Sequence, residues 1–267
     1  MATLLKSHPA TGGPGIEPRW TRSDKDGVGA AYSALSRVWF TVSKGILNEI
    51  YYPTVDRPQI RDLQYLITDG ETFFHDERRL NNTQELLAPD TLGYRITNVD
   101  PEGRYRIIKE IIADPHQDCV LVHTRLEANA DLLAKLRFFA LLAPHLEVGG
   151  RGNNGNVVET NWGKVLTAHK GGTWLVLAAS VPFLCCSCGY VGTTDGWQDL
   201  ARNFRVDCEF DCAPDGNIAL TGEIDIQHGR EFVLALGFSE SLHHALVTVA
   251  QALGTPFAAH RARFTMP

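Results

Sequence analysis

Three glycines have the spacing used by dinucleotide-binding proteins. Gly150, Gly152 and Gly155 form a G-x-G-x-x-G motif, which lets a backbone approach a pyrophosphate when a helix begins at the motif. Here the motif continues into the β-branched pair Val157-Val158, and nothing marks a helix start. We therefore interpret residues 153–156 as a long turn.

The cysteines are another group that could do chemistry. They are Cys119, Cys185, Cys186, Cys188, Cys208 and Cys212. Four thiolates can bind zinc tetrahedrally, but the usual C-x2-C pairs are missing. In a chain of this length, six clustered cysteines are too few for a disulfide scaffold. We expect reduced thiols that pack as small hydrophobic groups, and no metal site.

Histidines and carboxylates could supply acid–base chemistry. A sugar-converting site would need histidines beside a carboxylate, and inverting glycoside hydrolysis needs two carboxylates roughly 6.5–9.5 Å apart. No two of the ten histidines share a strand or helix face around a carboxylate, and most of the 31 acids are expected on solvated faces and turns. Asp195 and Asp215 have oxygen ligands suited to calcium but lack a recognisable loop spacing. No cofactor is predicted.

The composition excludes several classes of partner. The 267 residues are 44% hydrophobic and 21% charged, with a net charge of −6, so a large core can be buried. No basic run indicates nucleic acid, and no apolar stretch approaches the ~20 residues of a membrane span. The first 18 residues lack a signal-peptide pattern. This predicts a cytoplasmic protein, or a secreted or periplasmic one if a leader has been removed.

Short runs of β-branched, aromatic and aliphatic residues, separated by Gly, Asp, Asn and Pro, predict a many-stranded antiparallel fold. Strands are expected at residues 37–43, 46–52, 62–68, 94–99, 105–113, 119–126, 135–142, 164–168, 174–180, 204–210, 218–226 and 231–236. Turn signals such as Asp69-Gly70 and Gly171-Gly172 suit hairpins. So many strands exceed one open sheet, which predicts two packed sheets.

Other segments carry more specific expectations. In 218–226, apolar residues alternate with Thr221, Glu223 and Asp225, which predicts a strand with one solvated face. Ser239 or Ser241 should cap one helix that ends at Gly254, and a shorter helical turn is expected at 196–202. Residues 1–19 are predicted to form a flexible N-terminal arm on the surface, and residues 20–267 a single domain.

Longer blocks of sequence resemble a known family. They are Pro18-Arg19-Trp20, residues 25–29 (KDGVG), 36–41 (SRVWFT), 45–53 (GILNEIYYP), 195–200 (DGWQDL) and 220–224 (LTGEI). Together they resemble the opening domain of bacterial glucoamylases and glucodextranases of glycoside hydrolase family 15, from Trp20 to about Phe264. The resemblance implies an all-β super-β-sandwich of two large antiparallel sheets, similar to galactose mutarotase, with one or two short helices.

The same resemblance implies a function. In this family the sandwich packs against and supports a catalytic (α/α)6 barrel in the same polypeptide, and the parent enzyme releases glucose from α-glucans with inversion. The two catalytic glutamates belong to that barrel, which is expected to be absent from this chain, so the chain alone is predicted to be inactive. The alternative is a stand-alone carbohydrate-binding or mutarotase-like domain, in which histidine, carboxylate and aromatic side chains would converge in a polar cleft.

Five residues are predicted at the interdomain interface or the rim of the substrate site: Tyr51, Tyr52, Asp56, Arg61 and Asp62. The resemblance implies that the loop after the second strand runs toward the partner domain. Consecutive strand residues point to opposite faces, so at least one of the two tyrosines should point outward. An alternative interpretation is that the other tyrosine belongs to the core and that Arg61 and Asp62 form a local ion pair.

Overall fold

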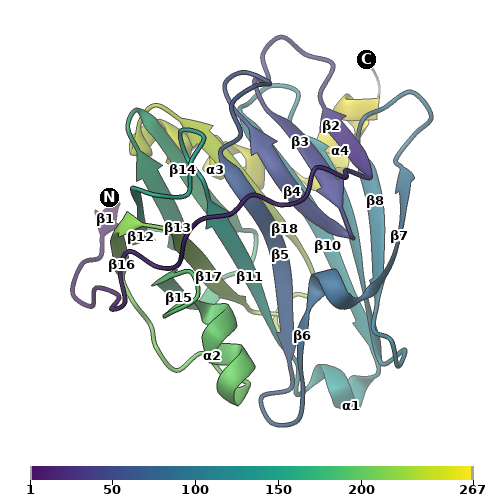
Figure 1. The fold of residues 1–267 in the computed structure, drawn as a ribbon. Coiled ribbons are helices and arrows are strands. Elements are labelled where there is room, and N and C mark those ends of the chain that lie inside the picture. The colour runs from purple at the N-terminus through teal and green to yellow at the C-terminus, as the bar shows by residue number, and fades with distance from the viewer. Residues whose placement is uncertain (1, 266–267) are drawn as a thin grey trace.

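The computed structural model describes residues 2–265 as two antiparallel sheets packed face to face (Figure 1). Sheet A has the order β1 (Thr3–Leu4), β12 (Asn153–Thr160), β13 (Gly163–Lys170), β14 (Thr173–Ala179), β18 (Glu231–Ser239), β10 (Cys119–Ala128), β9 (Tyr105–Ala113), β8 (Tyr94–Val99) and β7 (Asn81–Leu86), with β16 (Cys212–Gly216) beside β12. Sheet B has the order β15 (Phe183–Tyr190), β17 (Ile218–Ile224), β11 (Arg137–Pro144), β5 (Ile60–Thr68), β4 (Ile46–Tyr51), β3 (Trp39–Ser43) and β2 (Gly27–Ala30), with β6 (Phe74–Asp76) beside β5. The predicted all-β sandwich is confirmed.

The helices are few and short. They are α1 (Ala130–Leu133), α2 (Gly196–Asn203), α3 (Leu242–Gly254), α4 (Phe257–Thr265) and the 3-10 helix η1 (Glu77–Arg79). As predicted, the Ser241 hydroxyl caps α3 by accepting from the backbone N–H of His244. The sequence did not predict α4, because its apolar residues are spread around the helix and form no apolar face. No helix within residues 2–265 has the length and apolar character needed to cross a membrane.

Strand alternation determines which side chains enter the space between the sheets. In β5, Leu63, Tyr65 and Ile67 point into this space and are buried in the main apolar core. Asp62 and Gln64 therefore point to the outer face of sheet B. They are nevertheless buried, because other segments cover that face.

The N-terminal segment lies on the surface and is held by backbone pairing. Thr3 and Leu4 extend sheet A beside β12, and the following residues pass across the outer face of sheet B, where Figure 1 shows them in purple. The Asn217 side chain donates to the backbone carbonyl of Ile16. Met1 of the predicted arm and residues 266–267 of the predicted domain lie outside the described residues.

Two strand predictions were wrong. Residues 204–210, predicted as a strand, form an irregular segment. The Asp199 carboxylate accepts from the backbone N–H groups of Asp207 and Cys208, so these two groups do not pair with a neighbouring strand. In β17 the expected solvated face is buried. Since β17 lies between β15 and β11, and Leu200 of α2 packs over this part of the sheet, Thr221 and Glu223 are covered.

The glycine motif is only partly the long turn that the sequence predicted. Gly152 has a positive φ of 73° in the turn after β11, but Gly155 lies within β12. The turn prediction was wrong for residues 153–156, because they pair with β13 and β16.

Candidate functional site

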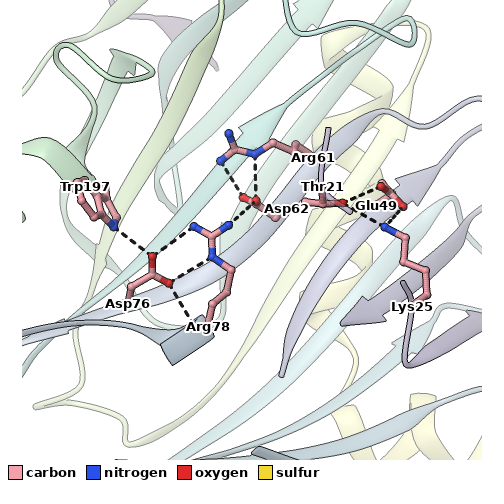
Figure 2. Close-up of polar contacts among 8 residues, drawn as sticks. All are labelled: Thr21, Lys25, Glu49, Arg61, Asp62, Asp76, Arg78 and Trp197. Carbon is pink, nitrogen blue, oxygen red and sulfur yellow. Dashed lines mark hydrogen bonds and ion pairs between the residues drawn. The ribbon is translucent and has the colours of Figure 1, made fainter. Parts of the chain in front are cut away.

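Two of the predicted site residues belong to a network of ion pairs on the outer face of sheet B. We call Arg61, Asp62, Asp76, Arg78 and Trp197 the polar cluster (Figure 2). The Asp62 carboxylate accepts from Arg61 Nε at 3.0 Å and from Arg78 Nη1 at 3.4 Å. Arg78 Nη2 also contacts Asp76 Oδ2 at 3.3 Å, and the Trp197 indole N–H donates to that oxygen at 3.2 Å.

Local structure positions these side chains. Arg61 and Asp62 are consecutive in β5, Asp76 ends β6, and Arg78 follows in η1. Asp76 also accepts from the backbone N–H of Arg78 and thereby caps η1, which is a standard role for aspartate at a helix start. The sequence predicted Arg61 and Asp62 as site residues. No sequence pattern singled out Asp76 or Arg78, which belong to the short charged run of residues 76–79.

The cluster is suited to structural support rather than proton transfer. The Asp62 side chain is fully buried, and both of its oxygens already accept from Arg61. Both oxygens of Asp76 accept from Arg78 as well. A general acid or base must reach a substrate proton within hydrogen-bonding distance, and carboxylates occupied in this way present no free oxygen to a sugar.

Tyr51 belongs to a neighbouring polar group, of which Figure 2 shows Thr21, Lys25 and Glu49. Its hydroxyl donates to Glu49 Oε2 at 3.2 Å, and Lys25 Nζ contacts the same oxygen at 2.7 Å. Thr21 donates to the other oxygen of Glu49. Burial is the main cause that raises the pKa of Tyr51 to about 12, and the charge of Glu49 adds to it. Tyr51 is thus the outward-pointing tyrosine, and it is half-buried.

Tyr52 is the core member of the pair. It is buried, and its ring stacks on Phe238 of sheet A with centroids 5.5 Å apart. Arg37 donates to its hydroxyl at 3.2 Å. Asp56 lies in the exposed connection between β4 and β5. The structure thus contains the core tyrosine and the Arg61–Asp62 ion pair of the alternative interpretation, and an interface role for these residues remains a prediction.

Several connections gather at one end of the sandwich, which we call the loop end: residues 31–38, 52–59, 114–118 and 145–152. Ion pairs join them. Arg37 pairs with Asp118 at 2.6 Å, and Arg57 pairs with Glu147. The last helix is adjacent, because His260 of α4 contacts Asp114 at 3.0 Å. Segments far apart in the sequence therefore meet at the loop end.

Large apolar side chains are exposed at the loop end. Tyr32, Leu35 and Val55 are 63%, 66% and 62% exposed, and Val148 is 49% exposed. Single exposed apolar residues are common, but a concentration on one end of a domain is typical of an interaction surface. This is the feature of the loop end that would suit another domain.

His145 is the buried histidine nearest the polar cluster. It is 1% exposed, its ring lies edge-on to Trp20 with centroids 4.7 Å apart, and neither ring nitrogen has a hydrogen-bond partner. Burial, together with the positive charge of Arg61, lowers its pKa to about 4. A neutral, enclosed imidazole is typical of a structural residue. The imidazole of His145 and the carboxylate of Asp62 are closed to solvent, although Trp20 beside them is 40% exposed.

The cysteines pack as small apolar groups. Cys119, Cys185, Cys186 and Cys188 are buried, while Cys208 is exposed. Burial raises the pKa of each of the four buried thiols, which disfavours the thiolate needed for metal binding. Within residues 2–265, no three histidine, cysteine or acidic side chains are grouped so as to hold a metal ion.

A small pocket opens beside the polar cluster, between β5, β11 and the start of α2. Its volume is about 240 Å³. The lining includes Arg61, Gln64, Arg78, Leu141, Trp197 and Gln198. A wider groove of about 1290 Å³ lies on the other side of the sandwich, between α4 and the outer face of sheet A.

Known proteins similar to this chain are carbohydrate-active enzymes. The family described as "Glucodextranase, domain N" matches residues 10–266. A glucoamylase from Clostridium sp. (strain G0005) is 32% identical over 238 residues, which are 89% of this chain and 34% of that protein. The chain therefore spans about a third of the length of this relative.

Solved structures give the same result for the fold. A bacterial glucoamylase, crystallised in complex with acarbose, matches 99% of this chain with a TM-score of 0.96 and 30% identity, and the match covers 39% of that chain. The family 92 glycosyl hydrolase ccman5 matches 94% of this chain with a TM-score of 0.55 at 10% identity, covering 35% of its own chain. The second likeness shows the fold alone.

Proposed function

The chain belongs to the family described as glucodextranase, domain N, and we propose that it serves as the non-catalytic N-terminal domain of a glucoamylase-type glycoside hydrolase. The parent enzyme would hydrolyse α-glucans and release glucose. This chain would pack against its catalytic domain and support it. Because the match covers 34% of the Clostridium glucoamylase, two thirds of such an enzyme lie outside this domain and leave room for a catalytic one.

The observation that carries this proposal is the exposed apolar surface at the loop end. Tyr32 and Leu35 in the β2–β3 connection, and Val55 in the β4–β5 connection, are each more than 60% exposed. The His260–Asp114 contact holds α4 at the same end. A segment that follows α4 would therefore leave the sandwich beside this surface, and the domain it leads to would lie close enough to cover it.

Some of the predicted interface residues hold the loop-end connections in place. Tyr52 anchors Arg37, which pairs with Asp118 and fixes the β2–β3 connection against the β9–β10 turn. Asp56 lies in the β4–β5 connection close to Val55. We propose that Asp56 and the exposed apolar residues contact the catalytic domain, and that Tyr52 and the Arg61–Asp62 pair hold their strands in place.

The direct test measures glucose release from maltooligosaccharides and from dextran. The purified chain is assayed alone, and then together with the separately expressed catalytic domain of the same enzyme. We expect no release by the chain alone and more release from the mixture than from the catalytic domain alone. Turnover by this chain alone would contradict the proposal, because the active site would then lie on the sandwich.

Binding variants locate the surface. Replacing Tyr32 and Leu35 together by serine should weaken binding to the catalytic domain at least tenfold in a calorimetric titration, since tyrosine is one of the residues that carry most of the binding energy at protein interfaces and Leu35 adds apolar area beside it. Leu184→Ser is the matched control, because Leu184 is similarly exposed, at 56%, but lies on the edge strand β15. Equal binding by the double variant and the control would exclude the loop end as the docking surface.

A further inference from the structure

We propose that the small pocket beside the polar cluster binds a single neutral hexose unit. The pocket lies on the outer face of sheet B, and its lining does not include Tyr32, Leu35, Val55 or Val148. Its floor is apolar and is formed by Leu141, Ala143 and Ala219, while Trp197 and Gln198 of α2 form one wall. Arg61, Gln64 and Arg78 contribute the polar side.

Gln64 is the observation that points to a ligand. It extends from β5 to the outer face, is 1% exposed and lines the pocket. Neither its amide nitrogen nor its amide oxygen has a hydrogen-bond partner within the chain. Buried polar groups are almost always paired, and an unpaired one requires an explanation. A primary amide offers two donors and an acceptor side by side, which matches adjacent hydroxyl groups of a sugar ring.

The rest of the lining has the same mixed character. Gln198 adds a second amide at the wall, and the Trp197 ring adds an aromatic surface beside the apolar floor. The indole N–H is already donated to Asp76, which fixes the ring. A pyranose has polar edges and apolar C–H faces, so it needs both kinds of contact, and this pocket provides both.

The charge balance favours a neutral ligand. Three arginines line the pocket, namely Arg61, Arg78 and Arg79, with the carboxylates of Asp76 and Asp195. Asp62 lies directly behind them and is paired with both Arg61 and Arg78. Three positive and three negative groups leave no net charge to attract an anion.

The size limits the ligand to one ring. A volume of about 240 Å³ is just below the roughly 300–1,000 Å³ of pockets that enclose drug-sized ligands. A longer saccharide could place only one unit in the pocket. The binding of a hexose is inferred from the pocket itself, and only the choice of glucose as the first probe rests on the proposed function.

The test is a titration of the ¹⁵N-labelled chain with glucose, methyl α-glucoside and maltose, followed by NMR. We expect the Trp197 indole N–H and the Gln64 side-chain amide resonances to shift saturably, with a dissociation constant on the order of 1–10 mM, corresponding to weak binding. Gln64→Leu keeps the side-chain size and should weaken binding at least tenfold. Gln251→Leu is the matched control on the exposed surface of α3 and should bind as the unsubstituted chain does.

Other outcomes would overturn the inference. No saturable shift with glucose, mannose or galactose, or undiminished binding by Gln64→Leu, would exclude the site. Inorganic phosphate that competes with the sugar would contradict a neutral ligand. If Gln64→Leu does not fold, Gln198→Ala on the surface of α2 replaces it and should weaken binding at least threefold. A failure of docking at the loop end would leave these results unaffected, so the two proposals can fail separately.

Discussion

The two outer faces of the sandwich are covered in different ways. On sheet A, α3 and α4 lie behind the strands in Figure 1 and bury Ala245, Val249 and Phe264 against Ile112 and its neighbours. This cover is largely apolar. The helices stay on the sheet because packing removes apolar surface from water, which stabilises the folded state by roughly 25 cal/mol per Å² of buried apolar surface. This contribution does not depend on a specific partner for each side chain.

On sheet B the cover is mixed, because Leu200 of α2 packs on Leu66 and Phe139 and buried charges lie beside this apolar cluster. The N-terminal segment, η1 and α2 close over the strands, and charged side chains of the polar cluster lie between them. Asp62 is completely buried and paired with Arg61 and Arg78. Each buried charge must be matched by an opposite one, because an unpaired buried charge is very costly. The comparison teaches that one fold can close one face largely by hydrophobic contact and the other by hydrophobic contact together with specific pairing of buried charges.

The largest effect should come from removing the shared carboxylate. Asp62→Ala would leave Arg61 and Arg78 without their common partner, and we expect a loss of about 4 kcal/mol in the free energy of unfolding, measured by urea denaturation. Asp56→Ala, at an exposed position, should leave the midpoint unchanged. A loss below about 1 kcal/mol for Asp62→Ala would mean that the polar cluster behaves as a surface ion pair.

On the apolar side, Phe264→Ala should cost about 3 kcal/mol, because a buried aromatic ring is lost and a cavity remains. Phe264 is 4% exposed and packs on Gly93 and Ile112. Val247→Ala, on the exposed side of α3, is the control and should change stability little. An unchanged denaturation midpoint for Phe264→Ala would show that α4 contributes nothing to the cover of sheet A.

Acid should act on the sheet B side through His145. Burial and the charges of Arg61 and Lys170 lower its pKa from 6.5 to about 4, so the native state disfavours the protonated ring. The stability it contributes is present above pH 6.5 and is lost as the pH falls toward 4, by about 3 kcal/mol in total. His145→Asn should flatten this part of the stability profile, measured by denaturation at a series of pH values.

His260 on the sheet A side should show the opposite sign. Its Nδ1 contacts Asp114 and its Nε2 contacts the carbonyl of Ala252. These contacts outweigh desolvation and raise its pKa. The stability it contributes is present below pH 6.5 and is lost as the pH rises through the folded-state pKa. His260→Gln should therefore be destabilised most at low pH, and an equal loss at all pH values would contradict this assignment.

The smallest effect is expected at the N-terminal segment. Glu17 pairs with Arg151, and both side chains are more than 60% exposed. Solvent screens such pairs, so Glu17→Ala should change the free energy of unfolding by less than about 0.5 kcal/mol. A loss above about 1 kcal/mol would show that the N-terminal segment is held as firmly as the polar cluster.

Much of the fold was predictable from local patterns. The predicted bounds of β8 and β9 agree with the structure, and the Ser241 cap located α3. β12 was missed because Asn153-Asn154-Gly155 has the composition of a turn, although these residues begin the second strand from the end of sheet A. The solvated face expected for β17 was wrong, because alternation alone does not reveal that another element covers the polar side.

The sequence by itself determined most of the strands, several of their turns and the family, because alternation, turn residues and motif blocks are local properties. Only the tertiary structure decided which charges meet. Arg78 reaches Asp62 across 16 positions in the sequence, and Trp197 reaches Asp76 across 121 positions. A local pattern carries no information about such separations, so the partners of Asp62, the unpartnered amide of Gln64 and the pocket beside it follow only from how the sheets and their covering segments pack.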